Sequence, residues 1–204
     1  MLDTVKIKTM YTIVALGNPG ERYEGTRHNV GRAVIDEFMR VYDFPPMKRS
    51  NNANALYAWS NVVDERIEVM FPETYMNKSG QSVKYAVDKH EVVPANIIVV
   101  HDDVSLPIGD IRVSFGRGDG GHNGITSIIQ TLKTKEFIRI RVGVAQKSFF
   151  GGIKKHSGSS LSQFVLKKFS GREKKELEDV SKKVEVALMH IFKSGVQHAM
   201  QECN

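Results

Sequence analysis

Polar side chains that can do acid–base chemistry stand where predicted strands end and predicted helices begin. They are Asn18 after the first apolar run, His28 and Asn77 at two helix entries, Asp102 after a central apolar run, and Asn123 at a later helix start. In open α/β sheets, ligands bind beyond the carboxyl ends of strands, so these positions are expected to converge. A histidine can take a proton from water, an aspartate can fix its tautomer, and amide N–H groups can bind oxyanion charge. The set therefore predicts hydrolysis by activated water.

Each of these residues also has an ordinary structural interpretation. Asparagine at a helix start is commonly a cap, and Asp102 suits a turn before residues 104–107. A single histidine such as His28 is commonly held by backbone groups. Tyr23 and Tyr75 suit half-buried aromatic packing as well as substrate contact. From residue types and spacing alone, both interpretations stay open.

Other catalytic patterns are weak or missing. Gly116, Gly118 and Gly121 satisfy G-x-G-x-x-G, but they lie past the middle of the chain, and Glu136 is the nearest acid after them. A dinucleotide site is therefore disfavoured, although such a turn can present free backbone amides to a phosphate or carbonyl oxygen. The sequence has no P-loop, no G-x-S-x-G and no metal-ligand spacing, and Cys203 stands in a terminus expected to fray. No metal and no cofactor are expected.

Alternating segments of strand-like and helix-like pattern must position these residues. Strands are predicted at residues 11–16, 54–63, 66–71, 96–100, 110–115 and 137–144. Helices are predicted after Arg27 with Thr26 or Asn29 as cap, at 79–90, at 124–132, and from the capping box Ser170–Glu173 to Gly195. This alternation predicts an α/β fold, a three-layer α/β/α sandwich around a twisted mixed sheet, as a single domain over residues 1–204.

The last quarter of the chain differs in composition from the rest. Residues 146–160 hold three Gly, four Ser and three Lys without apolar periodicity, which predicts a mobile loop. Residues 147–204 carry a charge of +5, against +1 for residues 1–146. A localised basic surface favours a polyanion such as nucleic acid, or is simply a solvated helix face.

The remaining composition bounds the location of the protein. No apolar run reaches eighteen residues, so no membrane span is expected, and Met1 to Met10 lacks the apolar region of a secretion signal. The single cysteine excludes an internal disulfide framework and fits a reducing cytoplasm. We therefore expect a cytoplasmic protein.

Several separated blocks together resemble one known family. The blocks are Leu16-Gly-Asn-Pro-Gly20, Tyr23, Thr26-Arg-His-Asn-Val-Gly31, Pro72-Glu-Thr-Tyr-Met-Asn77-Lys-Ser-Gly80, His101-Asp102, Leu106-Pro107 and Gly120-Gly-His-Asn-Gly124. In order and spacing they resemble bacterial peptidyl-tRNA hydrolase over about residues 10–145. Gln163-Phe-Val-Leu166 and the helix after it look like the lid of that family, so residues 161–204 are expected to form a basic lid and helix region.

The resemblance implies cleavage of the ester between a peptide and the 3′ end of tRNA, without a metal. The basic C-terminal helix suggests a monomer that meets RNA. It implies His28 as general base, Asp102 as the group that stabilises its productive form, and Asn18 as the residue that distinguishes N-blocked substrates. It also implies a substrate site lined by Tyr23, Tyr75, Asn77 and Asn123.

The sequence also departs from the family pattern. Ser114 stands where a lysine is common, and no basic-Pro step follows residue 144; Lys154, Lys155, Lys167 and Lys168 are expected to supply tRNA contacts instead. Two alternatives stay open: a non-catalytic RNA-binding relative and a dinucleotide-dependent enzyme. The presence of both His28 and Asp102 favours the hydrolase.

Overall fold

A seven-stranded sheet runs through the described part of the chain, in the order β2-β3-β4-β1-β5-β7-β6. The structure is a computed structural model that describes residues 10–148, 152–154 and 156–204. The strands are β1 (Met10–Ala15), β2 (Lys48–Ser50), β3 (Ala55–Val62), β4 (Glu65–Pro72), β5 (Ile97–Pro107), β6 (Ile111–Phe115) and β7 (Ile138–Ala145).

Helices connect and cover these strands. The longer ones are α1 (Val30–Val41), α2 (Ser79–His90), α3 (Asn123–Leu132), α4 (Gly158–Val165) and α5 (Gly171–Glu202). Short 3-10 turns stand before several elements: η1 (Glu21–Tyr23), η2 (Arg27–Asn29), η3 (Met76–Lys78) and η4 (Pro94–Asn96). The buried face of α5 includes Val180, Val184 and Leu188.

The sheet is mixed, as predicted. β1 runs parallel to β4 and β5, and β5 runs parallel to β7. β3 is antiparallel to β4, and β6 is antiparallel to β7. Strands covered on both faces need apolar residues throughout, which explains the continuous run Ile97–Val100 in the centre.

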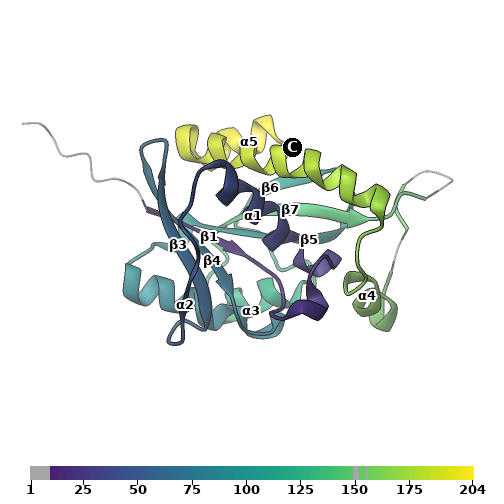
Figure 1. Cartoon of the computed structure of the whole chain (residues 1–204), viewed down its shortest axis with the longest axis horizontal. Helices are drawn as coiled ribbons and strands as arrows, with labels where there is room; N and C mark the ends of the chain where they lie inside the picture. The colour runs from purple at the N-terminus through teal and green to yellow at the C-terminus, as the bar shows by residue number, and fades with distance from the viewer. Residues whose placement is uncertain (1–9, 149–151, 155) are drawn as a thin grey trace, which may run out of the picture.

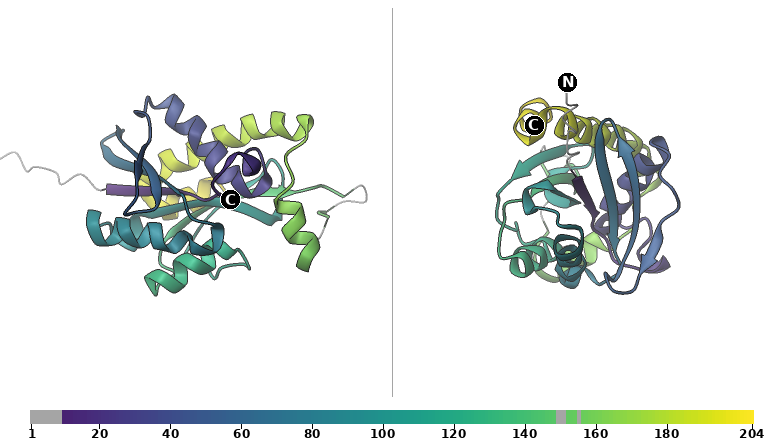
Figure 2. Two further views of the ribbon diagram at one scale, coloured as in Figure 1. Left: turned by 60° about the horizontal axis from the view of Figure 1, so that its bottom comes forward. Right: turned by 90° about the vertical axis from the view of Figure 1, so that its left-hand side faces the viewer.

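Helices lie on both faces of the sheet and give three layers (Figure 1). α1 and α5 pack on one face around residues such as Val34 and Leu188. α2 and α3 pack on the other around Val83 and Ile125. The end-on view in Figure 2 shows the strands between the two helical layers, which confirms the predicted α/β sandwich. In the described part of the chain, no helix combines the length and apolar character needed to cross a bilayer.

One predicted strand boundary in the centre of the sheet is wrong. The strand expected to end at Val100 continues to Pro107, so His101 and Asp102 lie inside β5. Polar residues at the end of an apolar run suggested a turn there. In the structure β5 keeps pairing with β7 through Asp103, shifts register, and pairs again at Pro107.

The glycine turn at residues 116–121 follows β6, which is antiparallel to β7. The turn therefore does not belong to the parallel βαβ unit that a dinucleotide site requires.

The end of the chain is more ordered than predicted. Gly195, with φ 83° and ψ 169°, is non-helical and interrupts α5 where the helix was predicted to end, but a second helical stretch follows it to Glu202. Cys203 is not frayed either, because its N–H donates to Ala199 O, and the Asn204 side chain bonds both backbone groups of Val113 on edge strand β6.

The predicted loop 146–160 is partly structured. Lys147 forms an antiparallel bridge with Ile153, and α4 already begins at Gly158. Residues 149–151 and 155 of this segment, and residues 1–9, lie outside the described residues. Whether the segment is mobile stays a prediction.

Candidate active site

His28 and Asp102 meet directly, although they are 74 positions apart in the sequence. His28 Nδ1 lies 2.8 Å from Asp102 Oδ1, and the two side chains are 13% and 2% exposed. η2 carries His28, and the middle of β5 carries Asp102. The two elements can approach because α1 begins with Val30-Gly31: a Cβ at Gly31 would lie only 2.4 Å from Val100 O of β5.

A second imidazole shares the same carboxylate oxygen. His122 Nε2 lies 2.9 Å from Asp102 Oδ1. Its Nδ1 accepts hydrogen bonds from the N–H groups of Gly124 and Ile125, at 3.1 and 3.4 Å, and so caps α3. An Nδ1 that accepts must be unprotonated, so the Nε2 of His122 carries the hydrogen and donates it to Asp102. His122 is thereby oriented as a hydrogen-bond donor to Asp102.

The same logic fixes His28 as a candidate base. Its Nδ1 donates to Asp102, which leaves the Nε2 lone pair to accept a proton. Burial lowers the pKa of His28, but the charge and hydrogen bond of Asp102 outweigh burial and raise that pKa above its ordinary value. Burial raises the pKa of Asp102, yet His28 and His122 together bring that pKa far below its usual range, so the carboxylate stays ionised.

A third histidine, His101, lies beside this pair but does not take up a proton at physiological pH. The ring of His101 lies 4.7 Å from that of His122, and its Nδ1 donates to the backbone oxygen of Asp102. Complete burial and the neighbouring His122 lower the pKa of His101 to about 3, so it is neutral at physiological pH.

His28, Asp102 and His122 also bring three potential metal-ligand atoms within 4.8 Å of one another. A metal would need lone pairs at His28 Nδ1 and His122 Nε2. Both of these nitrogens donate hydrogen to Asp102 instead, and the N–H groups at the start of α3 oblige His122 to do so. The hydrogen bonding therefore does not fit a metal ligand set.

Asn18 is locked beside the base by its neighbour Asn29. Its backbone N–H donates to Asn29 Oδ1 and its carbonyl accepts from Asn29 Nδ2, each at 2.9 Å. Asn29 thus occupies the start of α1 without capping it, and Thr26 does not cap η2 either, which corrects the predicted caps. Asn18 Oδ1 accepts from Met76 N at 2.8 Å, so its Nδ2 is the group left to bind a ligand.

Comparison with known proteins decides the family. The family model described as peptidyl-tRNA hydrolase matches residues 12–204. The chain belongs to the peptidyl-tRNA hydrolase family. It is 37% identical to the peptidyl-tRNA hydrolase of Thermoanaerobacter sp. (strain X514), covering 96% of this chain and 100% of that protein. The crystal structure of peptidyl-tRNA hydrolase from Acinetobacter baumannii matches with a TM-score of 0.85 at 29% identity, over 96% of this chain and 94% of that one.

In this family member a cleft of about 640 Å³ opens beside the paired imidazoles. Among the predicted site residues, His28, Asp102 and Asn123 line it. Its walls come from β5, β6, β7, the glycine turn and α4. The amides of that turn are not all free, because Gly121 N donates to Asp119 and those of Gly124 and Ile125 donate to His122.

The other predicted residues lie outside this cleft. Tyr75 is 55% exposed and Asn77 is exposed; they flank Met76, whose N–H is held by Asn18, so they stand beside Asn18. Tyr23 belongs to η1, where its hydroxyl accepts a hydrogen bond from Arg22. The structure thus groups Asn18, Tyr75 and Asn77 and joins them to His28 through Asn29. Among the described residues, Tyr23 makes no hydrogen bond to either group.

Sequence reasoning missed His122 and a group of arginines. Arg112 and Arg141 are cross-strand partners on β6 and β7, as are Ser114 and Arg139. Alternate residues of a strand share a face, so these side chains and Arg117 of the adjoining turn line the cleft together. The alternation Ile138-Arg-Ile-Arg141-Val was the available signal. His122 lies in a quoted block, but nothing in its spacing marked it as a partner of Asp102.

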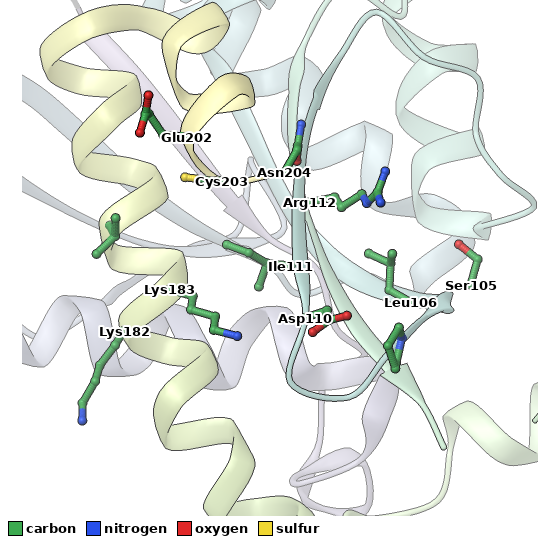
Figure 3. Close-up of a pocket in the computed structure, with 12 residues that line it drawn as sticks. Ser105, Leu106, Asp110, Ile111, Arg112, Lys182, Lys183, Glu202, Cys203 and Asn204 are labelled. Atoms are coloured by element: carbon green, nitrogen blue, oxygen red, sulfur yellow. The ribbon is translucent and has the colours of Figure 1, made fainter. Parts of the chain in front are cut away.

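A second hollow, with a volume of about 750 Å³, lies between β6 and α5. Figure 3 shows the residues that line it. Its lining includes Ile111, Lys183 and Cys203, and it contains none of the predicted site residues. Arg112 and Asn204 border both hollows, so the two adjoin. Burial and the neighbouring Glu202 raise the pKa of the Cys203 thiol, which makes it a poor nucleophile. The smaller cleft, with its ionised Asp102 and paired imidazoles, is the candidate active site.

Proposed function

We propose that the chain hydrolyses the ester between a peptide, or an N-blocked aminoacyl group, and the 3′ end of tRNA, and so releases free tRNA from stalled peptidyl-tRNA. The observation that carries this proposal is the His28–Asp102 pair, with Nδ1 engaged and Nε2 available beside an open cleft. Membership of the peptidyl-tRNA hydrolase family supports the substrate. We place this activity in the cytoplasm, in a monomer.

His28 Nε2 takes a proton from a water molecule, and the water oxygen attacks the ester carbonyl. Asp102 holds the imidazole in the required tautomer and stabilises the imidazolium that forms. The imidazolium then returns the proton to the leaving 3′ oxygen of tRNA. His28, Asp102 and Asn18 are the residues assigned to this chemistry, which uses no metal and no cofactor.

Side-chain amides around the base bind the ester and the peptide. Asn18 offers its free Nδ2, which suits the carbonyl oxygen of an N-blocked group and so discriminates against free aminoacyl-tRNA. Asn77 and Tyr75 extend this surface outward, and Asn123 offers an amide at the start of α3. We assign Tyr23 to the substrate site on the family resemblance alone.

Arginines supply the electrostatic part of tRNA binding. Arg112 and Arg117 are exposed at the rim of the cleft, and Arg141 is held by Asp103 at 2.6 Å. Guanidinium groups bind phosphate in a bidentate manner, which suits the acceptor stem and the 3′ end. The cleft therefore combines an anion-binding wall with a general base.

Turnover of an N-acetylated aminoacyl-tRNA by the wild type and by His28→Ala tests the proposal. Loss of roughly 10²-fold or more in kcat is expected for removal of a general base. Asn18→Ala is the companion variant, and it is expected to narrow the preference for N-acetylated over free aminoacyl-tRNA. A wild type that binds tRNA without turnover would favour a non-catalytic RNA-binding relative, and full turnover by His28→Ala would refute the assigned base.

A further inference from the structure

The side chain of Arg27, the residue before the base His28, extends into the junction between α4 and α5. The Arg27 guanidinium is buried, at 3% exposure for the residue. Its Nη1 donates to the carbonyls of Lys167 and Lys168, at 3.1 and 3.0 Å, and its Nη2 donates to Glu173 Oε1 at 2.7 Å. This fork spans the end of α4 and the first turn of α5.

Aromatic rings and a short backbone pairing complete the arrangement. The Arg27 Cζ lies 4.6 Å from the ring centre of Phe164 and 5.2 Å from that of Phe169. The backbone N–H of Arg27 also donates to Lys167 O, and Phe169 N donates to Gly25 O. Arg27 therefore holds Lys167 through its main chain and the whole junction 167–169 through its side chain.

The junction in turn positions one wall of the cleft. Leu161, Ser162 and Val165 of α4 line the cleft that contains His28 and Asp102. α4 packs on η2, the turn that carries His28, and it lies apart from the helices that cover the sheet (Figure 1). A shift of the junction would move the α4 wall relative to the base.

The contacts of Arg27 with the junction are better suited to fixing the orientation of α4 than to stabilising the fold. A buried ion pair contributes little net stability compared with apolar packing, because desolvation offsets its attraction. The guanidinium fork, however, fixes angles as well as distances. Glu173 is itself held from two sides, by Ser170 N at 2.7 Å and Gln146 Nε2 at 3.3 Å, so it forms a fixed partner.

We propose that Arg27 is a positioning residue for the reaction proposed above: its guanidinium holds the base His28 and the α4 wall in one fixed relation. The inference rests on the proposed function, since it assigns a role in that same site. It predicts that weakening the fork misplaces the base or the substrate in molecules that remain folded.

Arg27→Lys keeps the charge and removes the fork, and Arg40→Lys makes the same change in the exposed Arg40–Glu37 pair of α1. At a temperature where circular dichroism shows every variant folded, Arg27→Lys is expected to lower kcat by roughly 10- to 100-fold, with KM changed much less. Arg40→Lys is expected to match the wild type. Should Arg27→Lys not fold, Glu173→Gln serves instead, since it retains an acceptor for Ser170 N and removes the charge that faces Arg27.

A double-variant cycle with Leu161→Ala separates positioning from mere structural support. If Arg27 couples the α4 wall to the base, the effect of Leu161→Ala on kcat shrinks in the Arg27→Lys background. Wild-type kcat in Arg27→Lys, or strictly multiplicative effects of the two changes, would overturn the inference. Absence of turnover in the wild type would instead refute the proposed function, so the two failures are distinguishable.

Discussion

At the residue scale, Asp102 receives hydrogen bonds from two imidazoles that differ in what they can do next. The Nδ1 of His122 accepts hydrogen bonds from the N–H groups of Gly124 and Ile125, whereas the Nε2 of His28 stays available. Both are histidines bound to one carboxylate, so the residue type does not separate them. The neighbours of the distal nitrogen assign one as base and the other as a support for Asp102.

Replacing Asp102 by asparagine tests how the base is tuned. Asp102 raises the pKa of His28 against the opposing effect of burial, so without its charge that pKa is expected to fall below the ordinary 6.5. The acidic limb of the pH dependence of kcat/KM should then move to lower pH in Asp102→Asn, while the maximal rate falls. The measurement is a pH–rate profile together with NMR titration of His28, assigned with His28→Ala.

Asp103→Asn is the matched control for this experiment. It removes the same charge one position along β5, but Asp103 accepts hydrogen bonds from Arg141 and Ser105 and, among the described residues, from no imidazole. Its acidic limb is expected to stay near that of the wild type. An acidic limb that does not move in Asp102→Asn would contradict the proposed coupling between Asp102 and His28.

The raised pKa of His28 also affects folding stability. Its contribution is fully present at pH values below the pKa of His28 in the unfolded chain. It is lost as the pH rises through the higher pKa of His28 in the folded chain.

The site was only partly predictable at this scale. Strand ends and helix starts led to His28, Asp102 and Asn123, because sheet topology brings such positions together. They did not lead to Arg27, whose partners lie about 140 positions later in the chain. Contacts over such separations depend on the packing of the C-terminal region, and a local pattern carries no signal for them.

At the element scale, Gly31 sets the distance between α1 and β5. A Cβ there would lie 2.4 Å from Val100 O and 2.9 Å from Leu16 O. Both are backbone atoms near the site, Val100 in β5 and Leu16 directly after β1. Gly31→Ala is therefore expected to push α1 outward and to cost about 1–3 kcal/mol in unfolding free energy. Urea unfolding gives that free energy, and kcat should fall as well, since His28 lies three residues before Gly31.

Gly171→Ala provides the control. Gly171 is the first residue of α5, and a Cβ there meets nothing within 4 Å. Alanine is the better helix former, so this variant is expected to be neutral or more stable by up to about 1 kcal/mol. Equal stability of Gly31→Ala and the wild type would show that α1 and β5 do not need their close approach.

Element positions were predictable where local signals agree with tertiary packing. α2 has the bounds that the apolar spacing and Pro94 predict, and the capping box of Ser170 and Glu173 starts α5. The prediction failed at the end of β5, and it left out the helical stretch that follows the break at Gly195. Polar residues can continue a strand when they face a cleft, and a glycine can kink a helix whose next turns remain packed on β6 through Asn204.

At the scale of the whole molecule, positive charge gathers in two places. The composition of the chain points to the C-terminal quarter, where Lys154, Lys167 and Lys168 are exposed. The structure adds a wall of arginines along the cleft, on strands within residues 1–146, a part of the chain whose net charge is only +1. Charge counts along the sequence cannot reveal this wall, because β6 and β7 bring it together across the sheet.

The two groups make different predictions for the salt dependence of tRNA binding. Each cation that contacts a phosphate releases a counterion, so its loss is expected to flatten the plot of log Kd against log salt by about one unit of slope. Arg112→Gln and Arg117→Gln should each weaken binding in this way. Neutralising Lys154, Lys155, Lys167 and Lys168 together should also weaken binding and flatten the slope if the C-terminal region contacts tRNA.

Lys89→Gln is the control for the single arginine variants. It removes one positive charge at the exposed C-terminal end of α2 and is expected to leave the slope unchanged. Equal flattening by Lys89→Gln would mean that tRNA responds to net charge alone, and an unchanged slope in both arginine variants would remove the cleft wall from the tRNA path.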